Sequence, residues 1–318
     1  MLHFPKTRAD WLALRTTVVT STEMPALVGE SPYHTQFSLW HAKRNAQIDD
    51  FEAEGRMLWG LRLQDAIARG FAEDYGVKVR RLNAFVTHDQ CRMGASFDYE
   101  IVGCLESPKD TVVQDLYRKH GRGICEVKNV DGLVYKNNWP EGEAPGHIEI
   151  QLQVQTECSG CEWGVIVPLI GGNRIEPVIR TRDRDVGAGL ITLANEFWSS
   201  IDSDQPPAPD FVQDADLIRK VYGFADPGKL YDGRGNERVV ELCRQYTDGI
   251  ALEKQGKEAK DRARGELLTL IGSAEKAVAD GYSVSAAMRA GYRVEAYDVA
   301  PRRDFRVTAK KAATVTKE

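Results

Sequence analysis

The alternation of apolar and polar residues divides the chain into a mixed α/β part and a mainly helical part. Three segments of the first part carry apolar side chains at helical spacing, namely residues 56–75, 147–158 and 182–201. Between them lie short runs rich in β-branched and aromatic residues, which predict strands. The predicted strands cover residues 77–88, 91–101, 123–130, 163–170 and 175–180.

The order of these elements predicts an α/β fold in which helices flank a central mixed β-sheet. A proline-rich connector at residues 204–210 follows the last helix of this part. Beyond it, residues 237–280 are dense in Glu, Lys and Arg at helical spacing, and residues 306–318 predict a frayed tail. We therefore expect two domains, covering residues 1–205 and 206–318, of which the second is a mainly helical extension.

Composition adds limits to this picture. The chain has 318 residues, of which 42% are hydrophobic and 28% charged, as in a globular protein with a sizeable core. No run of eighteen apolar residues predicts a membrane span, and no apolar leader precedes the first helix, so we expect a cytoplasmic protein. The net charge of −5 is a weak argument against a nucleic-acid partner, because a whole-chain sum says nothing about a local groove.

The six cysteines predict reduced thiols, since disulfides are rare in a cytosol. Only Cys158 and Cys161 form a CxxC pair, and a four-cysteine metal site would need a second one. We therefore expect small buried side chains here in preference to a metal cluster.

The strongest candidate for chemistry is Glu126-Val127-Lys128, within a predicted strand. Because strand side chains alternate between faces, Glu126 and Lys128 share one face. This pair would be either an ordinary ion pair or a metal ligand beside a catalytic lysine. Asp98 ends a neighbouring strand, 28 residues earlier, and two carboxylates on adjacent strands could hold Mg²⁺.

Asp98 followed by Glu126-Val127-Lys128 resembles the core of PD-(D/E)XK nucleases, with Phe97 where that family has proline. The surrounding motifs narrow the resemblance to the YqaJ-type viral recombinases, the lambda-exonuclease-like group, over about residues 8–205. They comprise the opening segment from Trp11 to Lys43, then Trp59-Gly60-Leu61-Arg62-Leu63-Gln64, Gln151-Leu152-Gln153 and Phe197-Trp198.

This resemblance implies a PD-(D/E)XK restriction-endonuclease-like fold and a Mg²⁺-dependent 5′→3′ exonuclease, with Mn²⁺ able to substitute. Its substrate would be double-stranded DNA ends, and its product 3′ single-stranded tails for phage-type homologous recombination. The implied partners are a single-strand annealing protein of the RecT/Beta type and further copies of the chain in a ring trimer. The implied setting is the cytoplasm of a bacterial host, with a phage or prophage as the source.

The resemblance also assigns roles to individual residues. Arg15 and Thr22 stand where such nucleases hold the 5′-terminal phosphate, and an arginine fork suits phosphate oxygens. The proposed metal and catalytic residues are Asp98 and Glu126 as ligands, Val127 as a carbonyl ligand, Lys128 as the catalytic lysine and Gln151 as a further catalytic residue.

Gln64 departs from the family pattern, which generally has glutamate at this helix position. A glutamine can hydrogen-bond a metal-bound water but brings no negative charge. Asp65 points about 100° away on the helix and is a poor substitute. His147 and Gln155 share a helix face with Gln151, so both are candidates for helix contributions to the site, or parts of a solvated polar face.

Three arginine-rich clusters, around Arg80, Arg118–Arg122 and Arg180–Arg184, are candidates for phosphate contacts or ordinary solvated faces. We expect residues 104–122 to form a loop over the site. Three other functions stay open: a structure-specific endonuclease, a CRISPR-associated-like iron–sulfur nuclease, and a catalytically impaired DNA-binding scaffold, for which Gln64 is the main argument.

Overall fold

The computed structural model divides the chain into two compact units, Met1–Ile218 and Arg219–Glu318. The domain boundary at residue 205 stays a prediction. The predicted tail lies, from residue 308 onward, outside the described residues. The structure describes residues 1–47, 54–105, 111–291, 293 and 303–307.

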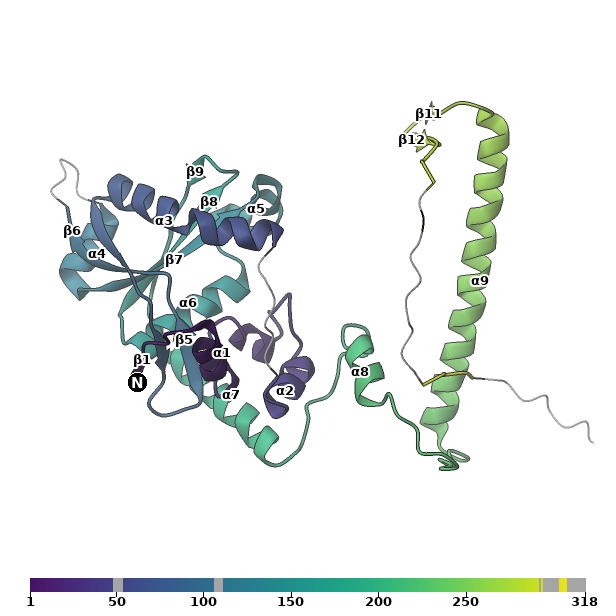
Figure 1. Ribbon diagram of the computed structural model, residues 1–318, viewed down its shortest axis with the longest axis horizontal. Coiled ribbons are helices and arrows are strands. Elements are labelled where there is room, and N and C mark those ends of the chain that lie inside the picture. Colours follow the sequence, from purple (N-terminus) through teal and green to yellow (C-terminus); the bar gives the residue numbers. More distant parts are fainter. Residues whose placement is uncertain (48–53, 106–110, 292, 294–302, 308–318) are drawn as a thin grey trace, which may run out of the picture. The chain divides into compact units, whose positions relative to one another are not determined.

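A mixed sheet forms the centre of the first unit (Figure 1). Its two longest strands, β7 and β8, pair in parallel, and the other pairs are antiparallel. With helices on both faces, the sheet confirms the predicted α/β class. In spatial order the strands are β10 (Val178–Thr181), β8 (Trp163–Ile170), β7 (Gly123–Val130), β6 (Tyr99–Cys104) and β3 (Val77–Arg81), with β9 (Arg174–Ile175) also beside β8.

Two helices cover the opposite faces of this sheet. On one face, Ile67 and Phe71 of α3 (Gly55–Tyr75) pack with the β7 and β8 side chains Cys125 and Val165. On the other face, α6 (Gly146–Ser159) packs through Leu152, among a second set of buried strand residues. The apolar character of β8 on both faces is therefore explained by a helix on each side.

A second, smaller sheet packs beside α6 and the closing helix α7 (Arg184–Asp202). Its order is β1 (Leu2–His3), β4 (Phe85–Thr87), β5 (Met93–Ser96) and β2 (Val19–Thr20). The remaining N-terminal elements of this unit are α1 (Arg8–Thr16), the 3₁₀ helix η1 (Met24–Val28) and α2 (Gln36–Arg44).

The predicted strands at residues 77–88 and 91–101 are wrong as single strands. Each divides into two strands that belong to different sheets, β3 and β4 for the first, and β5 and β6 for the second. Apolar alternation continues through both breaks, so periodicity alone does not reveal them. Asp98 lies in the second break, where the chain leaves one sheet and enters the other.

The prediction of a loop at residues 104–122 is also wrong in part. Thr111 caps a helix, α4 (Val112–His120), by a reciprocal capping box with Gln114. Val113 is buried in the α3 face of the core, and Gln114 donates to the carbonyl of Gly76 at 2.8 Å. Residues 106–110 lie outside the described residues. Between β7 and α6 the chain forms α5 (Gly132–Asn138) and η2 (Pro140–Gly142).

The second unit contains one long helix, α9 (Glu237–Ile271), and a two-stranded hairpin, β11 (Lys276–Ala279) and β12 (Tyr282–Ser285). Helix α8 (Ala215–Val221) spans the boundary between the units. The prediction of helix up to residue 280 is wrong beyond Ile271, because Gly272 has a positive φ that ends the helix. Among the described residues, no helix combines the length and apolarity that a membrane crossing requires.

Gly123 offers a stability test of the sheet next to the candidate site. A Cβ atom there would collide with the indole of Trp163, which is fully buried. Gly123→Ala should therefore lower the free energy of unfolding by about 1–3 kcal/mol. Gly60→Ala is the matched control, because a Cβ there meets open space within α3 and should stabilise by about 0.5–1 kcal/mol. Urea unfolding followed by circular dichroism measures both, and equal midpoints would contradict the packing argument.

Candidate active site

Asp98 is fixed between the sheet and helix α3. Its Oδ2 accepts a hydrogen bond from the backbone N–H of Val127 at 3.0 Å, and its Oδ1 accepts from Gln64 Nε2 at 3.0 Å. The break between β5 and β6 thus directs the Asp98 side chain toward β7, the strand that carries Glu126 and Lys128. The structure brings these residues together from three separate elements.

Glu126 is the centre of a buried hydrogen-bond network. Its Oε1 accepts from Lys128 Nζ at 2.6 Å and from Gln151 Nε2 at 2.7 Å, and its Oε2 accepts from Gln155 Nε2 at 2.7 Å. Lys128 also donates to Gln151 Oε1 at 3.1 Å. Gln151 and Gln155 lie one turn apart on α6, so this helix fixes the Glu126 carboxylate from above the sheet face.

The Asp98 carboxylate lies in an environment that disfavours its charged form. Burial, followed by the charge of Glu126, raises the pKa of Asp98 to about 7. For Lys128, burial opposes the charged form, but Glu126 and Asp98 outweigh it and raise the pKa of the ammonium. Lys128 is therefore a cation at neutral pH, and the paired carboxylates carry an electrostatic penalty that a further cation would relieve.

The donor set fits a hard divalent cation with water in its coordination shell. Asp98 and Glu126 offer carboxylate oxygens on adjacent segments, and the buried Oε1 of Gln155 has no hydrogen-bond partner. No three His, Cys, Asp or Glu side chains gather into a metal site in the described part of the chain. A cation here would accordingly draw on two carboxylates, a backbone carbonyl such as that of Val127, and water, which suits Mg²⁺.

Gln64 reaches Asp98 from α3, at the position where the family resemblance leads us to expect a carboxylate. Its amide donates to Asp98 and so favours the ionised form of that carboxylate without adding charge. Asp65 does not replace it, because its carboxylate accepts from the Tyr99 hydroxyl and pairs with Arg81 at 3.6 Å. The site thus has one negative charge fewer than a three-carboxylate arrangement.

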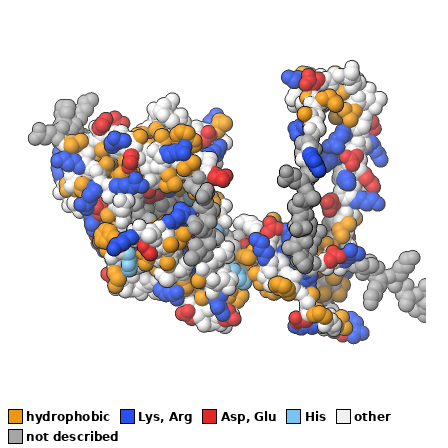
Figure 2. Space-filling view, viewed as in Figure 1, with side chains coloured by type: hydrophobic (Ala, Val, Ile, Leu, Met, Phe, Trp, Pro, Cys, Tyr) orange, Lys and Arg blue, Asp and Glu red, His pale blue; other side chains and the backbone are white. Residues whose placement is uncertain are grey.

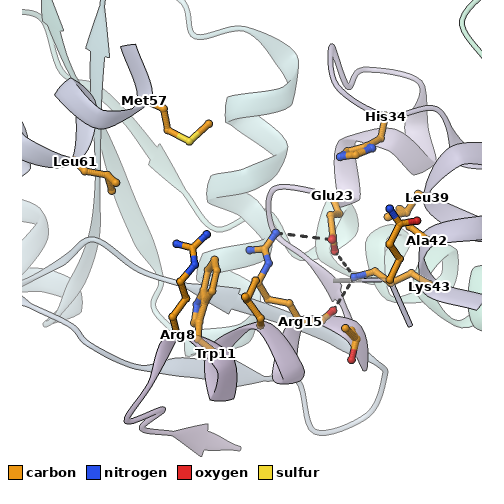
Figure 3. Close-up of a pocket in the computed structure, with 13 residues that line it drawn as sticks. Arg8, Trp11, Arg15, Glu23, His34, Leu39, Ala42, Lys43, Met57 and Leu61 are labelled. Atoms are coloured by element: carbon orange, nitrogen blue, oxygen red, sulfur yellow. Dashed lines mark hydrogen bonds and ion pairs between the residues drawn. The ribbon is translucent and has the colours of Figure 1, made fainter. Parts of the chain in front are cut away.

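Arg15 lines a separate cavity of about 330 Å³ (Figure 3), and Thr22 lies next to Arg15. Arg15 stacks on Trp11 and its Nη2 is 3.5 Å from Thr22 Oγ1 and 3.8 Å from Glu23. The same cavity is lined by Arg8 and His34. The family resemblance assigned Arg15 and Thr22 to one phosphate site, and in the structure they are neighbours, with Arg15 lining the cavity and Thr22 exposed.

Sequence reasoning missed an ion pair at this cavity, in which Lys43 is buried and Glu23 is partly buried. Lys43 Nζ pairs with Glu23 at 2.7 Å and donates to the carbonyl of Arg15 at 2.7 Å. Burial opposes ionisation of Glu23, but Lys43 and Arg15 hold its pKa below the ordinary value. A lysine on the buried face of α2, three residues after Trp40, was the available signal.

Helix α3 contributes residues both to this cavity and to the surroundings of the carboxylates. Leu61 lines the cavity, and Gln64, three residues further along the helix, bonds to Asp98. Three residues of α-helix rise about 4.5 Å, so the cavity and the carboxylate pair are neighbours along α3. Met57 and Leu61, the two α3 residues that line the cavity, are both about half exposed.

His147 lies at the rim of the carboxylate network, where it was expected as a helix contribution. Burial and then the charge of Lys128 lower the pKa of its imidazole. Its ring meets the ring of Tyr33 edge to face, with centroids 6.3 Å apart. Tyr33 appeared in the sequence only as part of a motif and was not expected at the site.

The arginine clusters that were candidates for phosphate contacts are largely ion-paired. Figure 2 shows basic, acidic and apolar side chains interspersed over the visible face of the first unit. Within the described residues, each pair joins an arginine to a nearby carboxylate. These pairs are Arg80 and Arg122 with Glu100, Arg81 with Asp65, Arg118 with Asp115, Arg180 with Glu143 and Glu149, Arg182 with Glu157, and Arg184 with Glu162.

The cysteines carry free thiols in the structure. Burial raises the pKa values of Cys125 and Cys158, which keeps these thiols protonated at neutral pH. Cys161 is buried next to the end of α6.

The sequence is similar to a known protein family. Residues 10–162, which contain the carboxylates, Lys128 and Arg15, match the model described as the YqaJ-like viral recombinase domain. The uncharacterized protein YqaJ of Bacillus subtilis (strain 168) is 25% identical over 268 residues, which cover 82% of this chain and 78% of that protein.

Two solved structures are also similar. The alkaline exonuclease LHK-Exo from Laribacter hongkongensis is 16% identical with a TM-score of 0.49, covering 66% of this chain and 98% of that one. A phage-related exonuclease from Haemophilus somnus 129PT is 12% identical with a TM-score of 0.40, covering 59% of this chain and 96% of that one.

Proposed function

We propose that this chain, which belongs to the YqaJ-like viral recombinase domain family, is a Mg²⁺-dependent exonuclease acting on the 5′ ends of linear double-stranded DNA. The observation that carries the proposal is the hydrogen-bonded network of Glu126, Lys128 and Gln151 within the matched domain, with Asp98 bonded to the backbone N–H of Val127 beside it. Such a network has the carboxylates and the lysine that metal-assisted phosphodiester hydrolysis requires.

The residues of the network take distinct roles in this proposal. Asp98, Glu126 and the carbonyl of Val127 would hold Mg²⁺, which when bound supplies an activated water and polarises the scissile phosphate. Lys128 offsets the negative charge that develops on the phosphate. Gln151, bonded to both Glu126 and Lys128, keeps the two at a fixed separation. Gln155 and Gln64 orient the two carboxylates from opposite sides.

The basic cavity on α3 suits the terminal phosphate of the strand to be digested. Arg15 presents a planar fork and Thr22 a hydroxyl, both of which bind phosphate oxygens. Because the cavity adjoins the carboxylates along α3, a phosphate held there would place the next phosphodiester toward the metal site.

A 5′→3′ exonuclease of this kind would leave 3′ single-stranded tails for phage-type homologous recombination. Those tails are the substrate of a single-strand annealing protein of the RecT/Beta type, which we propose as a partner. We also propose that the chain assembles as a ring trimer and that it is encoded by a phage or prophage in a bacterial host. Both statements rest on the family resemblance alone.

A digestion assay tests the proposed activity and its direction. Linear duplex is labelled on the 5′ end of one sample and the 3′ end of another, and both are incubated with protein and Mg²⁺. We expect early release of the 5′ label as mononucleotide and retention of the 3′ label on long single strands. Early release of the 3′ label would reverse the proposed direction. Cleavage of closed circular duplex would favour a structure-specific endonuclease instead.

The role of Arg15 gives a separate prediction. Wild-type protein should begin digestion faster on 5′-phosphorylated ends than on 5′-hydroxyl ends, and Arg15→Ala should abolish this preference. The expected loss is about 10-fold to 100-fold in the initial rate on phosphorylated ends, the size of a charge-assisted phosphate contact. Arg44→Ala is the control, because Arg44 is exposed and pairs with Asp204. Equal rates on both ends with wild-type protein would remove Arg15 and Thr22 from the site.

Gln64 favours a second candidate, a catalytically impaired DNA-binding scaffold. With an amide in place of a third carboxylate, the site has less charge to hold metal. Calorimetric titration with Mg²⁺ or Mn²⁺ separates the two functions. A scaffold should show no saturable binding that Asp98→Ala removes, whereas a nuclease should show it. The structure gives the iron–sulfur alternative no comparable support.

A further inference from the structure

An exposed aromatic side chain stands at the rim of the catalytic network. Tyr33 is 76% exposed, although tyrosine rings are usually at least half covered. Its ring meets that of His147 at 90°. His147 precedes Gln151 by one turn of α6, and Gln151 accepts a hydrogen bond from Lys128. Tyr33 and His147 therefore both lie close enough to the Lys128 ammonium to interact with its charge, and this ammonium would face the scissile phosphate.

The turn that presents Tyr33 is well fixed. Ser31 Oγ accepts from the backbone N–H groups of Tyr33 at 3.2 Å and His34 at 3.1 Å. Thr35 then caps α2 and donates its hydroxyl proton to Asp214 at 2.6 Å. Because the backbone on both sides of the ring is held, little ordering is needed when a ligand contacts it.

The chemistry of this rim suits a base and not a phosphate. Burial and Lys128 lower the pKa of His147, so its ring is neutral at physiological pH, and Tyr33 offers a flat apolar face. The cation that suits a phosphate is the neighbouring Lys128 ammonium, and not a group on this rim. A flat exposed ring beside a phosphate-binding cation has the geometry of a stacking platform for nucleic-acid bases.

We propose that Tyr33 binds substrate by stacking its ring on the base of the nucleotide next to the scissile phosphate, with His147 supporting the ring from its side. The proposal rests on the proposed function, since it takes a DNA strand end as the ligand. Stacking tolerates every base, because every base has a flat face. Tyr33 would thus hold the strand end in place without selecting sequence.

The test uses three forms of Tyr33 and two readouts. Tyr33→Leu should raise the KM for 5′-phosphorylated linear duplex about 10-fold or more, with kcat little changed, while Tyr33→Phe should match wild type. In the second readout, Lys128→Met protein, which keeps both carboxylates for Mg²⁺ and should digest DNA slowly, is mixed with Mg²⁺ and duplex carrying 2-aminopurine at one of the first three positions of the 5′ strand. Fluorescence should change at one position, and Tyr33→Leu added to that protein should abolish the change.

The two readouts separate failure of this inference from failure of the proposed function. If wild type digests DNA but Tyr33→Leu matches it in both readouts, the stacking proposal is overturned and the nuclease stands. If wild type does not digest DNA, the fluorescence change still tests the contact. A Tyr33→Phe variant as weak as Tyr33→Leu would overturn stacking, because the hydroxyl would then carry the effect.

Phe4→Leu is the matched control for loss of an exposed aromatic ring. Phe4 is 66% exposed and lines a different cavity of the same unit, with Arg80, Arg122 and Ser159 at the end of α6. It should leave KM and the fluorescence change as in wild type. Thermal unfolding should show the same midpoint for Tyr33→Leu and wild type, since the replaced ring is largely in solvent. If Phe4→Leu raised KM as much as Tyr33→Leu does, the effect would come from a general loss of apolar surface, and the assignment of Tyr33 would be overturned.

Discussion

Asp98→Ala should lower the release of nucleotides from 5′-phosphorylated linear duplex by about 10³-fold or more, because metal stabilisation of the transition state amounts to several kcal/mol. The same substitution removes the carboxylate that bonds to Val127 and Gln64. Saturable Mg²⁺ binding, measured by calorimetry, should disappear with the activity. Loss of both in one variant would identify Asp98 as a metal ligand.

Asp65→Asn is the matched control for this substitution. Asp65 is the next carboxylate along α3 from Gln64, but it is exposed and bonds to Tyr99 and Arg81 instead of the site. Its activity should stay within about twofold of wild type, which corresponds to about 0.4 kcal/mol. If Asp98→Ala and Asp65→Asn digest DNA equally well, the site does not carry the activity, and the scaffold becomes the better function.

Strand alternation was sufficient to predict part of this site. It placed Glu126 and Lys128 on one face of β7, and their side chains bond to each other there. Helical spacing put Gln151 and Gln155 one turn apart, and both reach Glu126 from α6. These predictions depended only on the local period of each element, which the chain fixes by covalent geometry.

Other features needed contacts that no local pattern encodes. Apolar alternation runs on through residues 82–84 and 97–98, so it could not show that the chain changes sheets there. The two breaks nevertheless create the site, because Asp98 lies in one of them. Likewise, the end of α9 is set by Gly272, after which the charged pattern continues in the hairpin β11–β12. Tertiary pairing decided the change of sheet, whereas a single glycine within a continuing charged pattern decided the end of α9.

The net charge of the first part of the chain also gave little information about DNA binding. Residues up to 204 hold 22 Lys and Arg against 29 Asp and Glu, although this part carries the proposed DNA site. The structure shows that many of these acids pair with arginines, as Glu100 does with Arg80 and Arg122. Arginines paired in this way contribute less to non-specific DNA affinity, so we expect binding to depend on the cavity around Arg15 and on divalent metal.

Lys128→Met should separate metal binding from turnover. Methionine has a similar length and no charge, so both carboxylates remain for Mg²⁺ while the cation opposite the phosphate is lost. Digestion should fall by about 10²-fold to 10³-fold, the effect of removing one charge-stabilising donor. Saturable Mg²⁺ binding should persist and become somewhat tighter, since a competing positive charge at 2.6 Å from Glu126 is gone.

Measuring metal binding and activity together distinguishes two roles for Lys128, positioning of the Glu126 carboxylate and stabilisation of charge on the phosphate. If Lys128 only holds the Glu126 carboxylate in position, its loss should weaken metal binding and activity together. If it acts on the phosphate, activity should fall while metal binding is kept, and saturating Mg²⁺ should not restore the rate. Lys136→Met, which changes an exposed lysine on α5, should alter neither quantity. Rescue of Lys128→Met by high Mg²⁺ would therefore assign the lysine to positioning, because only a weakened metal site responds to metal concentration.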